Sequence, residues 1–317
     1  MKFKKILTIG LSESSLSADY WKKIDALASK RISLAKEDSN IKTQLKDTDC
    51  LLVNPFAFKV EKEHIDAAHG LKYIGVISTA YGKVDYNYAA TKNIAVCNIP
   101  GYSTEAVAEL AFGVVLEHIR ELERAKRQVK AGDYSESTFF NTSEIMSKKF
   151  GILGLGKIGS RVAELAKAFG ADVYYWSKNR KKEQEDKGIK YVEVEKLLSM
   201  CDFISLHLAF TNDTRSFIND ARIKKIKHGA MLLNLAPNEL VDFEALDKRL
   251  SNGDIWYIAD HTDEMTPEQI KLLSKHKNCI LYPPIGYTTK EATIAKQEIF
   301  VSNIEGFIKG NPINKVN

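Results

Sequence analysis

The sequence has few cysteines, and none of them is placed to form a disulfide framework or a metal site. The four cysteines are far apart and include no C-x-x-C pair: Cys50, Cys97, Cys201 and Cys279. Such usage is typical of chains kept in a reducing compartment. We therefore expect a reduced, cytoplasmic protein without a metal ion.

Long apolar runs and a strong excess of charge are also missing. No stretch approaches the roughly 20 apolar residues that a membrane-spanning helix needs. The apolar run after the basic start MKFKKILTIG ends too early for a signal peptide. The net charge of +5 is spread along the chain, which disfavours nucleic-acid binding but suits a polyanionic cofactor. Neither a membrane nor a nucleic acid is expected as a partner.

The chain does have the length for two domains, together with a regular alternation of short β-branched runs and longer amphipathic runs. At 317 residues, each of two domains can bury its own core. The first series predicts strands at Lys5–Ile9, Cys50–Asn54, Tyr73–Ser78 and Ile94–Asn98, and helices at Ala18–Ser29, Glu61–Ala68 and Val84–Thr91. This alternation predicts a parallel sheet with helices on both faces.

A second series of six strands matches one doubly wound dinucleotide-binding domain. The strands are predicted at Phe150–Leu153, Asp172–Trp176, Phe203–Leu208, Met231–Leu235, Ile255–Ala259 and Cys279–Leu281. The closing helix, Lys290–Lys309, has no strand after it, so we expect it to return to the first domain. The predicted fold class is α/β with two doubly wound parallel-sheet domains. A substrate domain spans 1–100 plus 289–317, and a dinucleotide-binding Rossmann domain spans 101–288.

Between the two series, one long helix is expected from the N-cap Ser103 to a stop at Gly132. Its apolar stripe consists of Val107, Leu110, Ala111, Val114, Ile119 and Leu122. This stripe exceeds what one domain would bury. We therefore expect the helix to join the two domains and to take part in a homodimer.

The strongest local signal is the pattern G-x-G-x-x-G between an apolar strand and an amphipathic helix. In this setting the pattern favours a dinucleotide phosphate loop over an ordinary βα turn. The first glycine allows a tight turn, the second lets the backbone approach a pyrophosphate, and the third lets the helix pack on the sheet. Free amides and the helix dipole hold the phosphates. The predicted loop residues are Gly154, Leu155, Gly156, Lys157, Ile158 and Gly159.

The end of the second strand of this domain lacks the acidic residue that an NAD-selective site places against the ribose 2′-hydroxyl. The sequence has Ser177, Lys178, Asn179 and Arg180 there. These side chains offer charge-assisted donors to a 2′-phosphate, which favours NADP, with NAD the less favoured cofactor. A solvated basic loop is the alternative interpretation.

Four further stretches, in order and at the right separations, resemble the D-2-hydroxyacid dehydrogenase family over nearly the whole chain. They are LKYIGVISTAYGKVD from Leu71, PGYSTEAVAE from Pro100, DFISLHL from Asp202 and GAMLLNLAPNELVD from Gly229. The first is most similar to glycerate and hydroxypyruvate reductases. The resemblance implies a flavodoxin-like substrate domain and hydride transfer between NADP(H) and a small carbonyl or hydroxy substrate.

The resemblance also implies residues that contact the two ligands. The cofactor contacts outside the phosphate loop and the basic strand end are expected at Val107, His207, Leu208, Leu235, Ala236, Pro237 and Asp260. The substrate contacts are expected in the loop of Thr79, Ala80, Tyr81 and Gly82.

Three catalytic groups of the family are missing from this sequence. The position of the family's arginine is Pro237, that of its histidine is Pro284, and that of its glutamate is Met265. Proline can neither grip a carboxylate as a guanidinium does nor donate a proton to a carbonyl oxygen. The usual 2-hydroxyacid chemistry is therefore not expected in its usual form.

His261 and Glu264 are the candidate replacements for the missing acid–base group. His261 stands next to Asp260 and close to Asp263, and a histidine beside carboxylates can serve as a general acid. A surface histidine in a charged loop is the other interpretation. Further candidates are Tyr81, Lys83 and Tyr287.

Two functions remain open at this point. One is an NADP-linked oxidoreductase with relocated acid–base residues. The other is a catalytically impaired dinucleotide-binding protein with a regulatory or assembly role. We favour the oxidoreductase, because random decay would have damaged the cofactor motif as well. The expected partners are a small-molecule substrate and a second copy of the chain.

Overall fold

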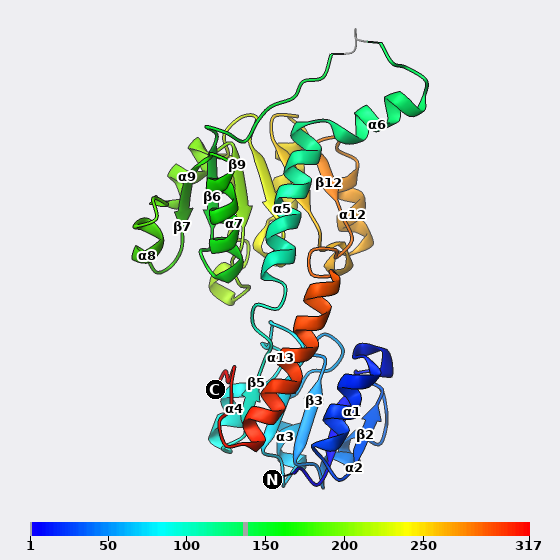
Figure 1. Ribbon diagram of the computed structural model, residues 1–317. Helices are drawn as coiled ribbons and strands as arrows, with labels where there is room; N and C mark the ends of the chain where they lie inside the picture. Colours follow the sequence, from blue (N-terminus) through cyan, green and yellow to red (C-terminus); the bar gives the residue numbers. More distant parts are fainter. Residues whose placement is uncertain (1, 136–138) are drawn as a thin grey trace. The chain divides into compact units, whose positions relative to one another are not determined.

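The computed structural model describes residues 2–135 and 139–317, and the chain forms two compact units (Figure 1). Unit 1 comprises Met1–Tyr102 and Lys290–Asn317, and unit 2 comprises Ser103–Thr289. Each unit is a parallel sheet with helices on both faces. The predicted α/β class with two doubly wound domains is therefore confirmed.

Unit 1 has the strand order β2-β1-β3-β4-β5, with all neighbours parallel. This is the flavodoxin-like order. Its strands are β1 Ile6–Ile9, β2 Arg31–Leu34, β3 Cys50–Val53, β4 Tyr73–Val76 and β5 Ala95–Cys97. Its helices are α1 Ala18–Ala26, α2 Ile41–Leu45, α3 Lys62–Ala67, α4 Tyr86–Thr91 and α13 Lys290–Ile308, with a short 3-10 helix η1 Glu13–Ser15.

The two faces of this sheet are covered by different helices. Successive residues of a strand point to opposite faces, so Ile6 packs with α1 and α13 while Leu7 packs with α2, α3 and α4. Phe300 of α13 is fully buried on the first face. The C-terminal helix is therefore part of the core of unit 1.

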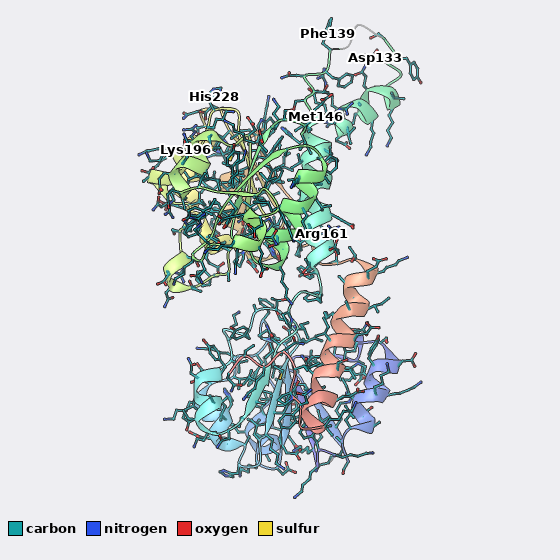
Figure 2. The ribbon with its side chains drawn as sticks, turned by 60° about the vertical axis from the view of Figure 1, so that its left-hand side comes forward. Asp133, Phe139, Met146, Arg161, Lys196 and His228 are labelled. Atoms are coloured by element: carbon teal, nitrogen blue, oxygen red, sulfur yellow. The ribbon has the colours of Figure 1, made fainter. Side chains whose placement is uncertain are left out.

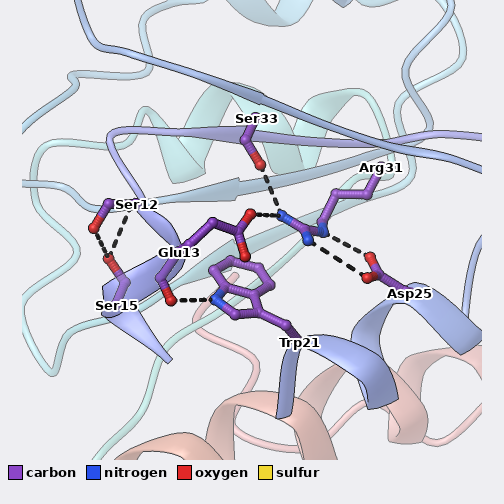
Figure 3. A network of polar contacts seen from close by, with 7 residues as sticks. All are labelled: Ser12, Glu13, Ser15, Trp21, Asp25, Arg31 and Ser33. Atoms are coloured by element: carbon purple, nitrogen blue, oxygen red, sulfur yellow. Dashed lines mark hydrogen bonds and ion pairs between the residues drawn. The ribbon is translucent and has the colours of Figure 1, made fainter. Parts of the chain in front are cut away.

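The edge strand β2 is absent from the sequence prediction, because its residues are partly exposed and do not alternate clearly. Arg31 holds this strand to its neighbours (Figure 3). Its guanidinium forms ion pairs with Glu13 at 2.9 Å and Asp25 at 2.6 Å, and it lies over the Trp21 ring at 4.2 Å. The edge is thus fixed by polar and cation–π contacts as well as by apolar burial.

Unit 2 has the strand order β12-β11-β10-β9-β6-β7-β8. Its strands are β6 Lys149–Leu153, β7 Asp172–Trp176, β8 Lys190–Tyr191, β9 Phe203–Leu206, β10 Met231–Asn234, β11 Trp256–Ala259 and β12 Cys279–Leu281. Seven strands replace the six expected, since the two-residue strand β8 is too short for a sequence pattern to reveal. The order reverses between β6 and β9, which is where ligands of such sheets bind.

The helices of unit 2 divide between the two faces of the sheet. α5 and α7 pack on one face, and α9 to α12 pack on the other. Their bounds are α5 Thr104–Ile119, α6 Leu122–Lys130, α7 Lys157–Ala168, α8 Lys182–Glu185, α9 Val194–Met200, α10 Asp220–Ile223, α11 Phe243–Leu250 and α12 Pro267–Ser274, with 3-10 helices η2 Asn212–Thr214, η3 Asn238–Leu240 and η4 Thr262–Glu264. Arg161 of α7, labelled in Figure 2, pairs with Glu105 of α5 at 2.8 Å.

The expectation of one continuous helix from Ser103 to Gly132 is wrong. The chain leaves helical geometry at Glu121, whose φ of +48° is left-handed, and α5 and α6 are separate helices. The Glu121 carboxylate fixes this bend by accepting hydrogen bonds from Arg124 and from the Asn141 backbone. The bend turns α6 away from the sheet of unit 2 (Figure 1).

The expected excess of apolar surface on α5 is also wrong. Val107, Ala111, Val114 and Ile119 are all buried in the core of unit 2 itself. Of the predicted stripe, Leu122 alone is exposed, and it lies on α6 beyond the bend. None of the helices among the described residues has the length and apolarity that crossing a membrane requires.

Replacing Phe300 by alanine should lower the stability of unit 1 by about 3–5 kcal/mol, because a large cavity would form in its core. The matched control is Ile294→Ala on the same helix, where the side chain is 51% exposed. We expect the control to change stability by less than about 0.5 kcal/mol. Urea unfolding followed by circular dichroism measures both. Equal effects would contradict the burial of α13 against this sheet.

Candidate functional site

Three glycines between β6 and α7 have different structural requirements. Gly154 has a φ of +100°, and a Cβ there would lie 2.7 Å from the His207 carbonyl oxygen. A Cβ at Gly159 would lie 2.0 Å from the Gly154 carbonyl oxygen. A Cβ at Gly156 would meet no atom within 4 Å. The first and third glycines therefore allow close packing, whereas the second borders open space.

This open space suits the pyrophosphate of a dinucleotide. Gly156 is the N-cap of α7, so the first amides of that twelve-residue helix have no partner within the helix. Leu155 is buried beneath the loop, while Lys157 is exposed and Ile158 is partly buried. The unpaired amides and the helix dipole favour an anion at this position. The residues present therefore fit the phosphates of a nicotinamide dinucleotide.

The basic residues after β7 are less available than the sequence indicates. Arg180 pairs with Glu185 and lies over the Tyr191 ring at 5.0 Å. The same guanidinium lowers the pKa of Glu185 to about 2, with a further contribution from the Tyr175 hydroxyl. The Ser177 hydroxyl donates to the Asn179 carbonyl oxygen at 2.6 Å.

Lys178 is the most weakly paired of the predicted basic residues in this loop. Its ammonium lies 3.7 Å from the Asp213 carboxylate, and both side chains are more than four-fifths exposed. An ion pair of this kind is weak and readily exchanged. Lys178 can therefore reach an anion beside β7 more easily than Arg180 can.

His207 follows β9 and lies against the phosphate loop through its own carbonyl group. Its Nε2 is 2.8 Å from the Ser205 hydroxyl. Burial lowers the pKa of His207 to about 3, so its imidazole is neutral at physiological pH. It suits a contact with the cofactor and does not suit proton donation. Ser205 was missed by sequence reasoning because nothing in the pattern marks a strand serine as a partner.

Asp260 lies at the carboxyl edge of the sheet, directly after β11, which is the second strand from one side. One of its carboxylate oxygens, Oδ2, accepts a hydrogen bond from the Gly286 backbone amide at 3.0 Å. A Cβ at position 286 would lie 2.6 Å from that oxygen and 3.6 Å from Val107 Cγ2. Glycine is therefore needed for the loop after β12 to approach Asp260, and Val107 packs behind it.

His261 lies between two carboxylates. Its Nε2 is 3.4 Å from Asp260 Oδ1, and its Nδ1 is 3.7 Å from Glu264 Oε1. The Tyr287 ring stacks beside it, with the centroids 6.4 Å apart. The predicted residues His261, Glu264, Asp260 and Tyr287 are thus brought together. Tyr81 and Lys83 belong to unit 1.

Asn238 is a member of this cluster that sequence reasoning missed. It begins η3 after β10, and its Nδ2 donates to the His261 carbonyl oxygen at 2.5 Å. Its Oδ1 is buried and has no hydrogen-bond partner among the described residues. The one available signal was its place at a strand end, next to Pro237.

Three other predicted cofactor contacts are apolar and at least partly buried. Leu235 and Ala236 are buried after β10, and Leu208 is partly buried after β9.

Burial and repulsion raise the pKa values of the acids in this cluster. Desolvation is the largest cause of the raised pKa of Asp260, and Asp263 adds repulsion. Desolvation likewise raises the pKa of Glu264, with further repulsion from Glu239 and Asp263. His261 acts in the opposite direction on both pKa values. The cluster is thus short of positive charge.

The three positions where acid–base or carboxylate-binding groups were sought hold apolar side chains. Pro237 is the N-cap of η3, and Pro284 lies in the loop after β12. Met265 is buried in the core of unit 2, so it does not reach solvent. Glu264, one residue earlier, points to His261 instead.

The predicted substrate loop lies in unit 1, after β4. The Thr79 hydroxyl donates to the Ile99 carbonyl oxygen at 3.1 Å, and the Ala80 amide donates to Ser78 at 3.1 Å. The Tyr81 ring packs edge-on against Tyr86 at 5.2 Å. A Cβ at Gly82 would meet nothing within 4 Å. The loop is thus anchored at its start and open near its end.

Gly156→Val should abolish dinucleotide binding and leave the unfolding midpoint unchanged, because the new side chain would enter only the open space. Gly159→Ala should instead lower the midpoint by several degrees, because its methyl group would collide with the Gly154 carbonyl. Fluorescence titration with NADPH and thermal unfolding distinguish the two effects. Near-native NADPH affinity in Gly156→Val would show that the phosphates bind elsewhere.

Comparisons with known proteins agree with this geometry. The family model described as the D-isomer specific 2-hydroxyacid dehydrogenase, NAD binding domain, matches residues 112–286. A glyoxylate reductase of Thermococcus litoralis is 36% identical over 284 residues, which cover 86% of this chain and 85% of that protein.

Two solved structures are similar over almost the full length. One is a D-lactate dehydrogenase from Aquifex aeolicus complexed with NAD and lactic acid, with a TM-score of 0.83, 26% identity and 96% of both chains covered. The other is an acyclic imino acid reductase in complex with NADPH and D-Arg, with a TM-score of 0.83, 27% identity and coverage of 99% and 100%. On the strength of this family model and these relatives, the chain belongs to the D-isomer specific 2-hydroxyacid dehydrogenase family, and it is an oxidoreductase that uses a nicotinamide dinucleotide.

Proposed function

We propose that this oxidoreductase transfers a hydride between NADP(H) and a small carbonyl or hydroxy substrate, with His261 and Glu264 as its acid–base pair. The observation that carries this proposal is the position of His261 between Asp260 and Glu264 at the carboxyl edge of the unit 2 sheet. Parallel sheets of this type bind their ligands at that edge.

The bound cofactor supplies the hydride, and the chain's own residues bind and orient the ligands. The amides at the start of α7 hold the phosphates, and Asp260 holds the nicotinamide end. His261 donates a proton to the substrate oxygen, and Glu264 stabilises the protonated imidazole. Because the resemblance puts Pro237, Met265 and Pro284 where the family's arginine, glutamate and histidine are expected, we assign these tasks to the neighbouring residues. The loop Thr79–Gly82 of unit 1 is proposed to contact the substrate.

The choice of NADP rests on the absence of an acid after β7 and on the exposed ammonium of Lys178. An aspartate or glutamate there would repel a 2′-phosphate. Ser177 supplies a hydroxyl at the same position, and Arg180 would have to share its guanidinium with Glu185. Of the two solved relatives described above, one contains NADPH and the other NAD, so the proposal rests on these residues alone.

NADPH should bind more tightly than NADH by roughly tenfold or more, because one charge-assisted hydrogen bond contributes about 1.5–3 kcal/mol. Ser177→Asp should reverse this preference through charge repulsion. The same change at the exposed Ser199 of α9 is the control and should leave it intact. Fluorescence titration measures all three proteins. Equal affinities in the unchanged protein would remove the NADP assignment.

Glyoxylate, hydroxypyruvate and pyruvate should be reduced very slowly with NADPH. Pro237 offers no grip to their carboxylate, and a misplaced proton donor costs about 10²–10⁴-fold in rate. For a carbonyl substrate that is turned over, His261→Ala should lower kcat while leaving NADPH affinity unchanged. The exposed His228 provides the control variant His228→Ala. Brisk reduction of the three 2-oxo acids, or an unchanged kcat in His261→Ala, would argue against the assigned roles.

The protein is proposed to form a homodimer through α6 and the residues beside it, and not through α5. Val129, Tyr134 and Phe139 are 55%, 77% and 89% exposed, which is unusual for large apolar side chains so close in sequence. Figure 2 shows Phe139 far from the sheet of unit 2, near Asp133. A second copy of the chain would cover this apolar surface.

Phe139→Asp should convert the dimer to a monomer at micromolar concentration, because a charge would be buried in the interface. Phe56→Asp, at another exposed phenylalanine in unit 1, should leave the dimer intact. Light scattering gives the mass of each variant. A monomeric unchanged protein would rule out the homodimer.

A further inference from the structure

The carboxyl edge of unit 2 collects negative charge around a single imidazole. Glu239, Asp260, Asp263 and Glu264 come from the ends of β10 and β11, and His261 lies among them. In the described part of the chain, His261 is the one basic side chain within ion-pair distance of Asp260 and Glu264. The same negative charges act on Tyr287. Burial is the largest cause of the raised pKa of its hydroxyl, and Asp263, Asp260 and Glu264 each raise that pKa further.

Two buried acceptors in this cluster accept no hydrogen bond, although His261 Nε2 lies 3.4 Å from one of them, Asp260 Oδ1. The Asp260 side chain is 2% exposed, and its Oδ1 has no hydrogen-bond partner among residues 2–135 and 139–317. The same holds for Oδ1 of Asn238, whose Nδ2 is committed to the His261 carbonyl. Buried acceptors of this kind are costly unless a donor binds to them. If Asp260 holds the cofactor, the Asn238 oxygen still lacks an N–H or O–H donor.

A cationic donor would satisfy both the charge and the acceptors. An anionic 2-oxo acid would meet like charge here, and no guanidinium stands at position 237 to compensate it. A protonated imine carries a positive charge and an N–H group. Its reduction needs no proton donor, so a proline at position 284 would not slow the reaction.

We propose that the substrate reduced at this site is a protonated imine, formed from a small carbonyl compound and an amine and lacking a carboxylate group. Hydride transfer from the reduced dinucleotide forms one C–H bond at the imine carbon. The π electrons of the C=N bond become the lone pair of the nitrogen, and the positive charge passes to the oxidised cofactor. No proton is taken up in this step. The carboxylates stabilise the cation, and Asn238 Oδ1 accepts its N–H.

This inference rests on the proposed hydride transfer with NADPH. It replaces the carbonyl oxygen, which would take a proton from His261, by an iminium nitrogen that needs none, so His261 would here help to position the substrate between the carboxylates. The activity test compares NADPH oxidation with cyclohexanone alone and with cyclohexanone plus methylamine. We expect oxidation to be at least about tenfold faster with the amine. Adding methylamine to glyoxylate should give a much smaller gain, because that imine keeps its carboxylate.

The binding test does not depend on turnover. It measures the affinity of the NADP⁺-loaded protein for N-methylcyclohexylamine, a cation at neutral pH, and for the neutral cyclohexanol by calorimetry. The amine should bind at least roughly tenfold more tightly, which corresponds to about 1.4 kcal/mol. Glu264→Gln should remove most of this difference. Glu244→Gln, which changes an exposed glutamate on α11 by the same charge, should retain it.

The outcomes separate the two proposals. Reduction of cyclohexanone that methylamine does not accelerate, or equal affinity for amine and alcohol, would overturn the imine substrate and leave the NADP-linked oxidoreductase standing. Unchanged selectivity for the amine in Glu264→Gln would likewise overturn the role of the acidic cluster. Failure to bind NADPH at all would overturn both proposals.

Discussion

The close approach of Gly159 to the Gly154 carbonyl is the constraint on which the rest of unit 2 depends. No side chain fits between them, since a Cβ would lie only 2.0 Å from the carbonyl oxygen. This contact sets α7 against β6, and a second one sets Gly154 against the carbonyl of His207 after β9. The two strands on either side of the reversal in strand order are thereby joined at their ends. This packing leaves open space beside Gly156, where we propose that a phosphate binds.

The same edge of the sheet determines what chemistry is available. Strands β10, β11 and β12 are parallel and in register, so the residues that follow them meet. Asp260 fixes the loop after β12 by accepting a hydrogen bond from the Gly286 amide. Asn238 fixes the loop after β11 by donating a hydrogen bond to the His261 carbonyl oxygen. Each of these two side chains uses one polar atom for support. The other oxygen of each, Oδ1, accepts no hydrogen bond among the described residues, although His261 lies at ion-pair distance from that of Asp260.

Much of the fold could be predicted from the sequence, because its signals are local. The glycine pattern at 154–159 directly follows β6, and the strands β9 and β10 are short runs of buried, mostly apolar residues that a sequence pattern reveals. The strands β2 and β8 could not be found, since one is half-exposed and the other has two residues. The bend at Glu121 depends on a hydrogen bond to Asn141, twenty residues away, which no helical pattern contains.

The site was predictable in part, for the same reason. His261 and Glu264 are three residues apart, so their contact follows from a single turn of η4. Arg180 and Glu185 are also close in sequence, but no pattern in the sequence showed that Arg180 would be paired with this glutamate. Asn238 follows β10 and donates a hydrogen bond to His261, which follows the adjacent strand β11. This contact, and the Asn238 Oδ1 that accepts no hydrogen bond, depend on the folded sheet, so the sequence could not reveal them.

The central claim is that His261 and its carboxylates face the reacting carbon of a dinucleotide held by α7. A crystal structure of the protein with NADPH tests it most directly. The account predicts pyrophosphate oxygens on the amides that follow Gly156 and the nicotinamide C4 within about 4–5 Å of a substrate atom that also contacts the His261 cluster. A nicotinamide that lies away from β11, with His261 turned to solvent, would contradict it.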